Sequence, residues 1–137
     1  MEHYRAAVTI NPRDGRGWFC IANVLKDRGQ KQEAEHAFIE ATKHLKVAYQ
    51  AHENLGILYM DQDRKEEAYR QFELAVADLE DPVKGLRPLS GGPYMVLGLA
   101  RKDQSRLDDA AALFRRAAEF KDTRDDALKQ LNGLGKP

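Results

Sequence analysis

The chain has 137 residues, of which 42% are apolar and 32% charged, and its 22 Lys and Arg residues balance 22 Asp and Glu residues. This length suits a single domain, and the absence of net charge argues against the basic surface that nucleic-acid binding requires. No apolar run reaches the ~18 residues of a membrane span, and the single cysteine, Cys20, cannot form an internal disulfide. We therefore expect a protein of a reducing compartment, the cytoplasm, with Cys20 as a small packing residue.

Apolar residues recur at three- and four-residue spacing along most of the chain, which predicts helices throughout. Pro12 should end the first helix, because proline cannot continue a helical hydrogen-bond ladder. The chain should reverse direction at Gly29, Asp63 and Ser105. Glycine and aspartate tolerate a left-handed backbone conformation better than serine, so we expect another geometry at Ser105. The predicted helices are 1–10, 15–28, 31–45, 48–62, 65–80, 92–104, 107–120 and 123–132.

Seven positions of one helix pair recur along the chain, which is the signature of a repeat architecture. The second copy lies 34 residues after the first (Trp18 to His52), and the third lies 42 residues after the second (His52 to Tyr94). The three sets are Trp18, Ile21, Ala22, Leu25, Ala34, Phe38 and Ala41; His52, Leu55, Gly56, Tyr59, Ala68, Phe72 and Ala75; and Tyr94, Leu97, Gly98, Arg101, Ala110, Phe114 and Ala117. Tyr4, Ala7 and Pro12 match only the later half of the unit, so we expect the chain to begin inside a repeat.

This pattern resembles the tetratricopeptide repeat (TPR), and the resemblance covers nearly all of residues 1–124. It implies an all-α fold, a right-handed superhelical solenoid of helix-turn-helix pairs with a C-terminal capping helix. The expected parts are the second half of a truncated repeat at 1–14, full repeats at 15–48, 49–82 and 91–124, an inserted loop at 83–90, and a capping helix with its tail at 125–137.

Small residues should let the two helices of each pair approach closely. These are Ala22, Gly56 and Gly98, with Ala34, Ala68 and Ala110 facing them. Phe38, Phe72 and Phe114 are then expected to fill the space between one pair and the next. At the C-terminal end, Asp122 or Thr123 is expected to cap the last helix, and Gly133 to end it.

In the tetratricopeptide family the first helix of each pair lines the concave face, where most members bind their partners. Transferred position by position, this resemblance implies a groove for an extended peptide or an amphipathic helix of a partner protein. Five of its residues would form an apolar strip, Phe19, Ile57, Met60, Met95 and Leu99. The alternative is that these five are core residues on slightly rotated helices. The implied groove residues are Arg16, Phe19, Asn23, Lys26, Gln50, Glu53, Ile57, Met60, Met95, Leu99 and Lys102.

One subclass of the family binds the acidic tails of heat-shock chaperones through a clamp of basic residues and asparagines. Asn23 and Asn54 match the asparagine positions of this clamp. Phe19, Gly92 and Val96 occupy its basic positions, so we do not expect chaperone-tail binding.

The sequence offers no catalytic motif. Its four histidines are scattered, no pair has the spacing of zinc ligands, and neither Ser90 nor Ser105 lies in a nucleophile elbow. The glycines near residue 91 lack the lysine and hydroxyl of a phosphate-binding loop. We therefore expect no enzyme, no cofactor and no metal.

Several features leave alternatives open. The insertion 83–90 contributes binding contacts or is merely a tolerated loop. Arg101, in a position that is otherwise apolar or aromatic, should pack its stem and extend its guanidinium to water or a carboxylate, although a role in a site is possible.

Two other functions remain as alternatives to partner binding. The module could self-associate through its N-terminal half-repeat, giving a homo-oligomer. It could instead be the accessory arm of a larger enzyme, such as a glycosyltransferase, or of a secretion or pilus assembly factor.

Overall fold

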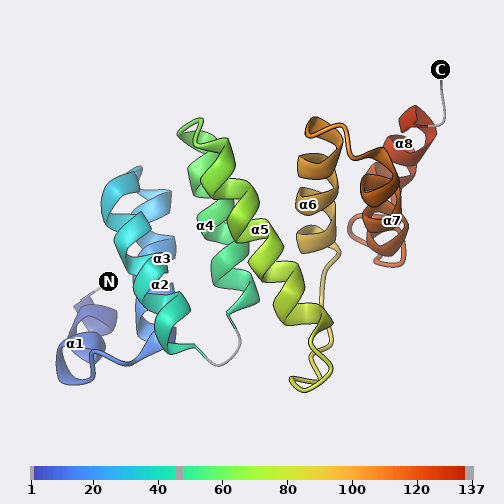
Figure 1. The fold of residues 1–137 in the computed structure, drawn as a ribbon. Coiled ribbons are helices and arrows are strands. Elements are labelled where there is room, and N and C mark those ends of the chain that lie inside the picture. The colour runs from blue at the N-terminus through green and yellow to red at the C-terminus, as the bar shows by residue number, and fades with distance from the viewer. Residues whose placement is uncertain (1, 46–47, 135–137) are drawn as a thin grey trace. The chain divides into compact units, whose positions relative to one another are not determined.

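The computed structural model describes residues 2–45 and 48–134, and this part of the chain contains helices and no strand (Figure 1). Every helix begins and ends within three residues of its predicted bounds. The predicted tail residues 135–137 lie outside the described part. The helices are α1 (Glu2–Ile10), α2 (Gly15–Asp27), α3 (Lys31–His44), α4 (Tyr49–Asp61), α5 (Lys65–Glu80), α6 (Gly92–Asp103), α7 (Leu107–Ala117) and α8 (Arg124–Leu134).

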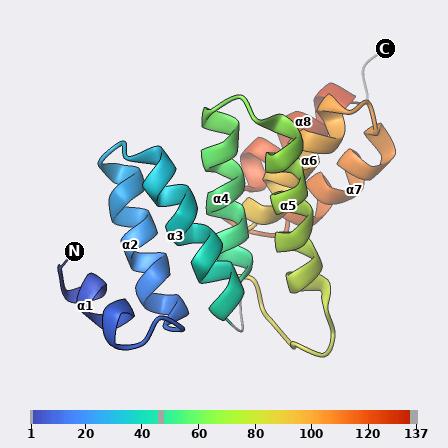
Figure 2. The ribbon, with the colours of Figure 1, turned by 60° about the vertical axis from the view of Figure 1, so that its left-hand side comes forward.

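The helices form two compact units, Met1–Gln71 and Phe72–Pro137, and the division between them falls inside α5. In the first unit, α2 and α3 form a helix pair, with α1 packed on α2 and α4 packed on α3 (Figure 2). Ala22 of α2 and Ala34 of α3 are completely buried, as the repeat pattern predicts, and so is Phe38. Val8 of α1 is buried against α2. A methyl group added at Gly17 of α2 would lie 3.0 Å from the Cγ1 atom of Val8.

The second unit contains the pair of α6 and α7, followed by α8 on α7. Gly98 of α6 is buried, and a methyl group added to it would lie 2.6 Å from the Cε1 atom of Phe114 on α7. A side chain at this position would hold the two helices apart. The ring of Phe114 therefore packs on Gly98 within its own helix pair. The repeat pattern predicts that this ring fills the space between one pair and the next, and it does not predict the contact with Gly98. Tyr94 is also buried, and its ring stacks on Phe120 with the centroids 6.1 Å apart.

The three turns within the helix pairs share one backbone geometry. Gly29, Asp63 and Ser105 have φ angles of 77°, 58° and 59°. At Ser105 the backbone N–H donates to the carbonyl of Lys102, and the next N–H donates to that of Arg101, as at the end of α2. This bonding satisfies carbonyls that the helix end leaves open. The expectation of another geometry at Ser105 is therefore wrong, because the helix end requires a left-handed residue whichever side chain it carries.

The last helix differs from its prediction at both ends. Gly133 lies inside α8, so the prediction that it ends the helix is wrong, and an added methyl group there would meet no atom within 4 Å. Before the helix, the hydroxyl of Thr123 donates to the carbonyl of Ala117 at 2.7 Å. Asp122 accepts hydrogen bonds from the Ser90 hydroxyl and the Gly91 N–H. These two bonds fasten the end of the inserted loop to the turn before α8.

Candidate functional site

The predicted apolar strip lies on the protein surface. Ile57 and Met60 of α4 are 38% and 39% exposed, and Leu99 of α6 is 41% exposed. Phe19 of α2 and Met95 of α6 are half-buried. None of the five belongs to the buried core, in contrast to most repeat positions of the same helices. The alternative that they are core residues does not agree with this exposure, whereas their role in binding stays a prediction.

The polar members of the predicted groove differ in their surroundings. On α2, Asn23 and Lys26 are half-buried, and on α4 Gln50 is exposed. Glu53 is half-buried and takes part in an interaction. In the second unit, the Lys102 ammonium donates to the side-chain carbonyl of Gln130 on α8 at 2.8 Å. The last helix, α8, therefore contacts one of the predicted groove residues.

A hollow of about 700 Å³ opens in the first unit where α2, the end of α3 and the start of α4 come together. It contains three of the residues that the sequence assigned to the groove, Arg16, Phe19 and Gln50. Sequence reasoning missed the other lining residues, because they come from a loop and from helix ends that the repeat pattern does not cover. The complete lining is Asn11, Arg13, Asp14, Gly15, Arg16, Phe19, Cys20, His44, Leu45 and Gln50.

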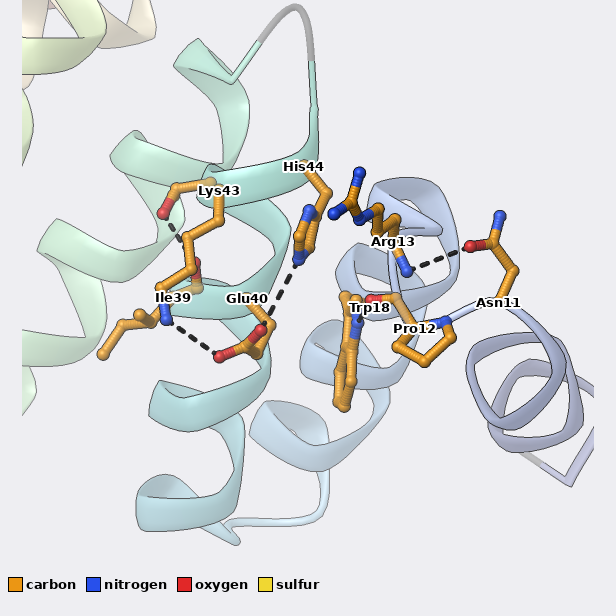
Figure 3. Close-up of polar contacts among 9 residues, drawn as sticks. Asn11, Pro12, Arg13, Trp18, Ile39, Glu40, Lys43 and His44 are labelled. Carbon is orange, nitrogen blue, oxygen red and sulfur yellow. Dashed lines mark hydrogen bonds and ion pairs between the residues drawn. The ribbon is translucent and has the colours of Figure 1, made fainter.

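Hydrogen bonds within the loop before α2, and between this loop and the first turns of α2, fix one part of the lining of this hollow (Figure 3). The side-chain carbonyl of Asn11 accepts from the Arg13 N–H at 3.1 Å, and the Asp14 carboxylate caps α2 by accepting from the Gly17 N–H at 3.0 Å. The indole N–H of Trp18 donates to the carbonyl of Pro12 at 2.8 Å. The backbone that carries Arg13 is therefore held at three points.

Another part of the lining comes from the last turn of α3, which carries His44 (Figure 3). The Nε2 atom of His44 lies 3.7 Å from a carboxylate oxygen of Glu40, whose other oxygen accepts from the Lys43 ammonium at 3.1 Å. This hydrogen bond from Lys43 lowers the pKa of the Glu40 carboxyl group. Glu40 is thus a charged group that is already engaged by two neighbours on its own helix.

Two other arginines have structural partners. In the first unit Arg64 forms ion pairs with Glu35 and Glu67, and its Cζ atom lies 4.4 Å from the ring centroid of Tyr59. In the second unit the guanidinium of Arg101 lies 3.5 Å from the Glu73 carboxylate, and its side chain is only 11% exposed. The prediction that Arg101 packs its stem and reaches a carboxylate is confirmed.

The described residues include no group of three His, Cys, Asp or Glu side chains that could hold a metal ion. Cys20 is half-buried and takes part in no disulfide among the described residues. Within residues 2–45 and 48–134, no helix has the length and apolar character that crossing a membrane requires.

The comparisons with known proteins agree on the fold. The family model of the tetratricopeptide repeat matches residues 21–82. Protein O-mannosyl-transferase TMTC3 of Mus musculus is 25% identical over 125 residues, and the same protein of Homo sapiens is 24% identical over 125 residues. Each match covers 86% of this chain but only 14% of the relative's length.

Solved structures of tetratricopeptide proteins resemble the chain as well. YrrB, described as a TPR protein with an unusual peptide-binding site, has a TM-score of 0.79 at 21% identity, covering 96% of this chain and 63% of YrrB. PilF of Pseudomonas aeruginosa has a TM-score of 0.74 at 19% identity, with 96% and 56% covered. The first TPR of Spaghetti (RPAP3), bound to an HSP90 peptide, has a TM-score of 0.69 at 18% identity, with 88% and 89% covered.

These likenesses confirm the predicted all-α solenoid fold. The family model matches the part of the chain from α2 to the end of α5, and the paired helices with buried small residues continue through α7. Residues 21–82 match the model of the tetratricopeptide repeat family, and the described part of the chain has the fold of solved tetratricopeptide proteins.

Proposed function

We propose that this chain is a protein-interaction module that binds an extended peptide or an amphipathic helix of a partner protein. The binding side chains are those that α2, α4 and α6 leave exposed. The observation that carries the proposal is the exposure of Ile57, Met60 and Leu99 on helices most of whose repeat positions are buried. Two structural relatives, YrrB and RPAP3, are described with a peptide-binding site or a bound peptide, which supports peptides as the class of ligand.

The spacing of these exposed and half-buried residues fits a binding surface. Ile57 and Met60 are three residues apart on α4, and Met95 and Leu99 are four apart on α6, so each pair shares one helix face. Methionine adapts to different partners, because its unbranched thioether side chain repacks at low cost. On each helix, an apolar anchor of a peptide would cover the pair and remove it from water.

A displayed library of random peptides tests this proposal. The wild-type chain is expected to enrich a set of peptides, and Ile57→Asp is expected to abolish their binding while lowering the free energy of unfolding by no more than about 1 kcal/mol. Ile10→Asp is a matched control, since Ile10 is 86% exposed on α1, outside the proposed surface. Equal binding by wild type and Ile57→Asp would refute the proposal.

A second proposal is that the module is the accessory arm of a larger enzyme or assembly factor. Its support is the match to two O-mannosyl-transferases, of which the chain spans only 14%, and the likeness to PilF. In this case the module itself binds and does not catalyse. Sequencing the complete reading frame tests the proposal, because a catalytic domain or further repeats in the same frame would support it and a frame limited to these residues would refute it.

Self-association through α1 is the third proposal. Ile10 lies on the surface at the end of this helix, and a second copy could cover it. Light scattering over a range of concentrations decides the matter: a mass that rises with concentration, and falls again in Ile10→Asp, supports self-association. A monomer at every concentration rules it out.

A further inference from the structure

The hollow beside α2 contains two arginines without an ion-pair partner among the described residues. Arg13 and Arg16 line it, and both are exposed. Elsewhere in the same unit, Arg64 and Lys43 are engaged by carboxylates. Other basic side chains of the unit, such as Arg28 and Lys31, also have no ion pair among the described residues, but they do not line this hollow, whereas Arg13 and Arg16 do.

The position of Arg16 makes an anion favourable beside its guanidinium group. Arg16 lies in the first turn of α2, which contains no acidic residue. The amino end of a helix carries a partial positive charge, so a cation there is unfavourable unless an anion lies nearby. The carboxylate of Asp14 accepts from the Gly17 N–H, and Glu40 is engaged by Lys43. Neither acid is thus a dedicated partner of Arg16.

The hollow also has an apolar part. Phe19, Cys20 and Leu45 line it next to the charged groups. The ring of Phe19 packs edge-on against the buried ring of Phe38, with the centroids 6.1 Å apart. This contact fixes the position of the Phe19 ring. A rigid aromatic surface beside two cations suits a ligand that has an apolar side chain next to a carboxylate.

We propose that this hollow binds an acidic residue that neighbours an apolar residue in the partner peptide. The proposal rests on the peptide-binding function above and specifies the chemistry of its ligand. Arg13 and Arg16 would donate charge-assisted hydrogen bonds to the carboxylate, while the apolar side chain covers Phe19 and Leu45. Because Phe19 and Gln50 belong both to the hollow and to the predicted groove, a peptide bound along α2 and α4 can reach it.

The experiment uses peptides selected by the complete chain from a displayed random library. Asp or Glu next to an aliphatic or aromatic residue should be enriched among them. The affinity of an enriched peptide is then measured for wild type and for the double variant Arg13→Glu/Arg16→Glu, together with its analogue in which the acidic residue is replaced by its amide. A matched control is Arg28→Glu/Lys31→Glu, which changes the net charge equally at the turn between α2 and α3, where both residues are exposed.

We expect the double variant to lose about tenfold or more in affinity for the acidic peptide, as removal of one charge-assisted contact does. It should bind the amide analogue as wild type does, and the control should bind both peptides as wild type does. Selected peptides without acidic enrichment, or equal affinities of wild type and Arg13→Glu/Arg16→Glu, would overturn the inference and leave the proposed function intact. A wild-type chain that selects no peptide would overturn both.

Discussion

Replacing Gly98 by alanine should destabilise the second unit. The new methyl group would lie 2.6 Å from Cε1 and 2.8 Å from Cδ1 of Phe114, a ring with no exposed surface. Overpacking of this kind costs about 1–3 kcal/mol, and the added methyl group would lie under 3.0 Å from two ring carbons, so we take about 2–3 kcal/mol. Alanine stabilises a helix interior by about 1 kcal/mol relative to glycine. The expected net loss is about 1–2 kcal/mol.

Urea denaturation followed by circular dichroism measures this loss. Gly133→Ala is the matched control, because Gly133 also lies inside a helix and an added methyl group there meets no atom within 4 Å. The control should be as stable as wild type or slightly more stable. If Gly98→Ala were equally stable, the close approach of α6 and α7 that the repeat pattern predicts would be refuted.

Three further predictions concern stability. Ser105→Gly should stabilise the protein by about 0.5 kcal/mol, because it relieves the left-handed backbone of a non-glycine residue while adding flexibility to the unfolded chain; a lower melting temperature would contradict the argument. Phe72→Ala should cost about 3–5 kcal/mol, since this side chain is only 3% exposed, and an unchanged thermal melt would show that its burial contributes nothing. Burial, as the largest cause, raises the pKa of the Tyr59 and Tyr94 phenols above 10.0. The stability that the neutral phenols contribute is therefore fully present below pH 10.0 and is lost as the pH rises through the folded-state pKa values. Urea denaturation should show a free energy of unfolding that falls over this alkaline range. A free energy of unfolding that stays constant would contradict the direction of the pKa shifts.

The helix pairs could be predicted from the sequence because their defining positions are those that packing restricts most. Ala22, Ala34 and Ala110 are completely buried, and Gly98 has no room for a side chain. Local propensity was a weaker guide. Ser105 adopts the left-handed conformation against its preference, because the hydrogen bonds at the end of α6 require it.

The hollow could be predicted only in part. Arg16 and Phe19 follow from their positions in the repeat, whereas Arg13 lies in an irregular loop. His44 and Leu45 come into the hollow through the packing of α3 beside α2. No periodicity connects these segments, and the charge pattern of the chain is balanced overall. The local excess of cations becomes visible only when the loop and the helix ends are placed in space.

The proposed binding surface is tested most directly by nuclear magnetic resonance of the isotope-labelled chain during titration with an enriched peptide. Its predicted effect is a set of saturable chemical-shift changes at Ile57, Met60 and Leu99, the exposed apolar residues of α4 and α6. The outward residues Glu66 and Arg115 of α5 and α7, which are also exposed, should remain unchanged. Shift changes confined to the second helices of the pairs, with none at Ile57, Met60 or Leu99, would contradict the account.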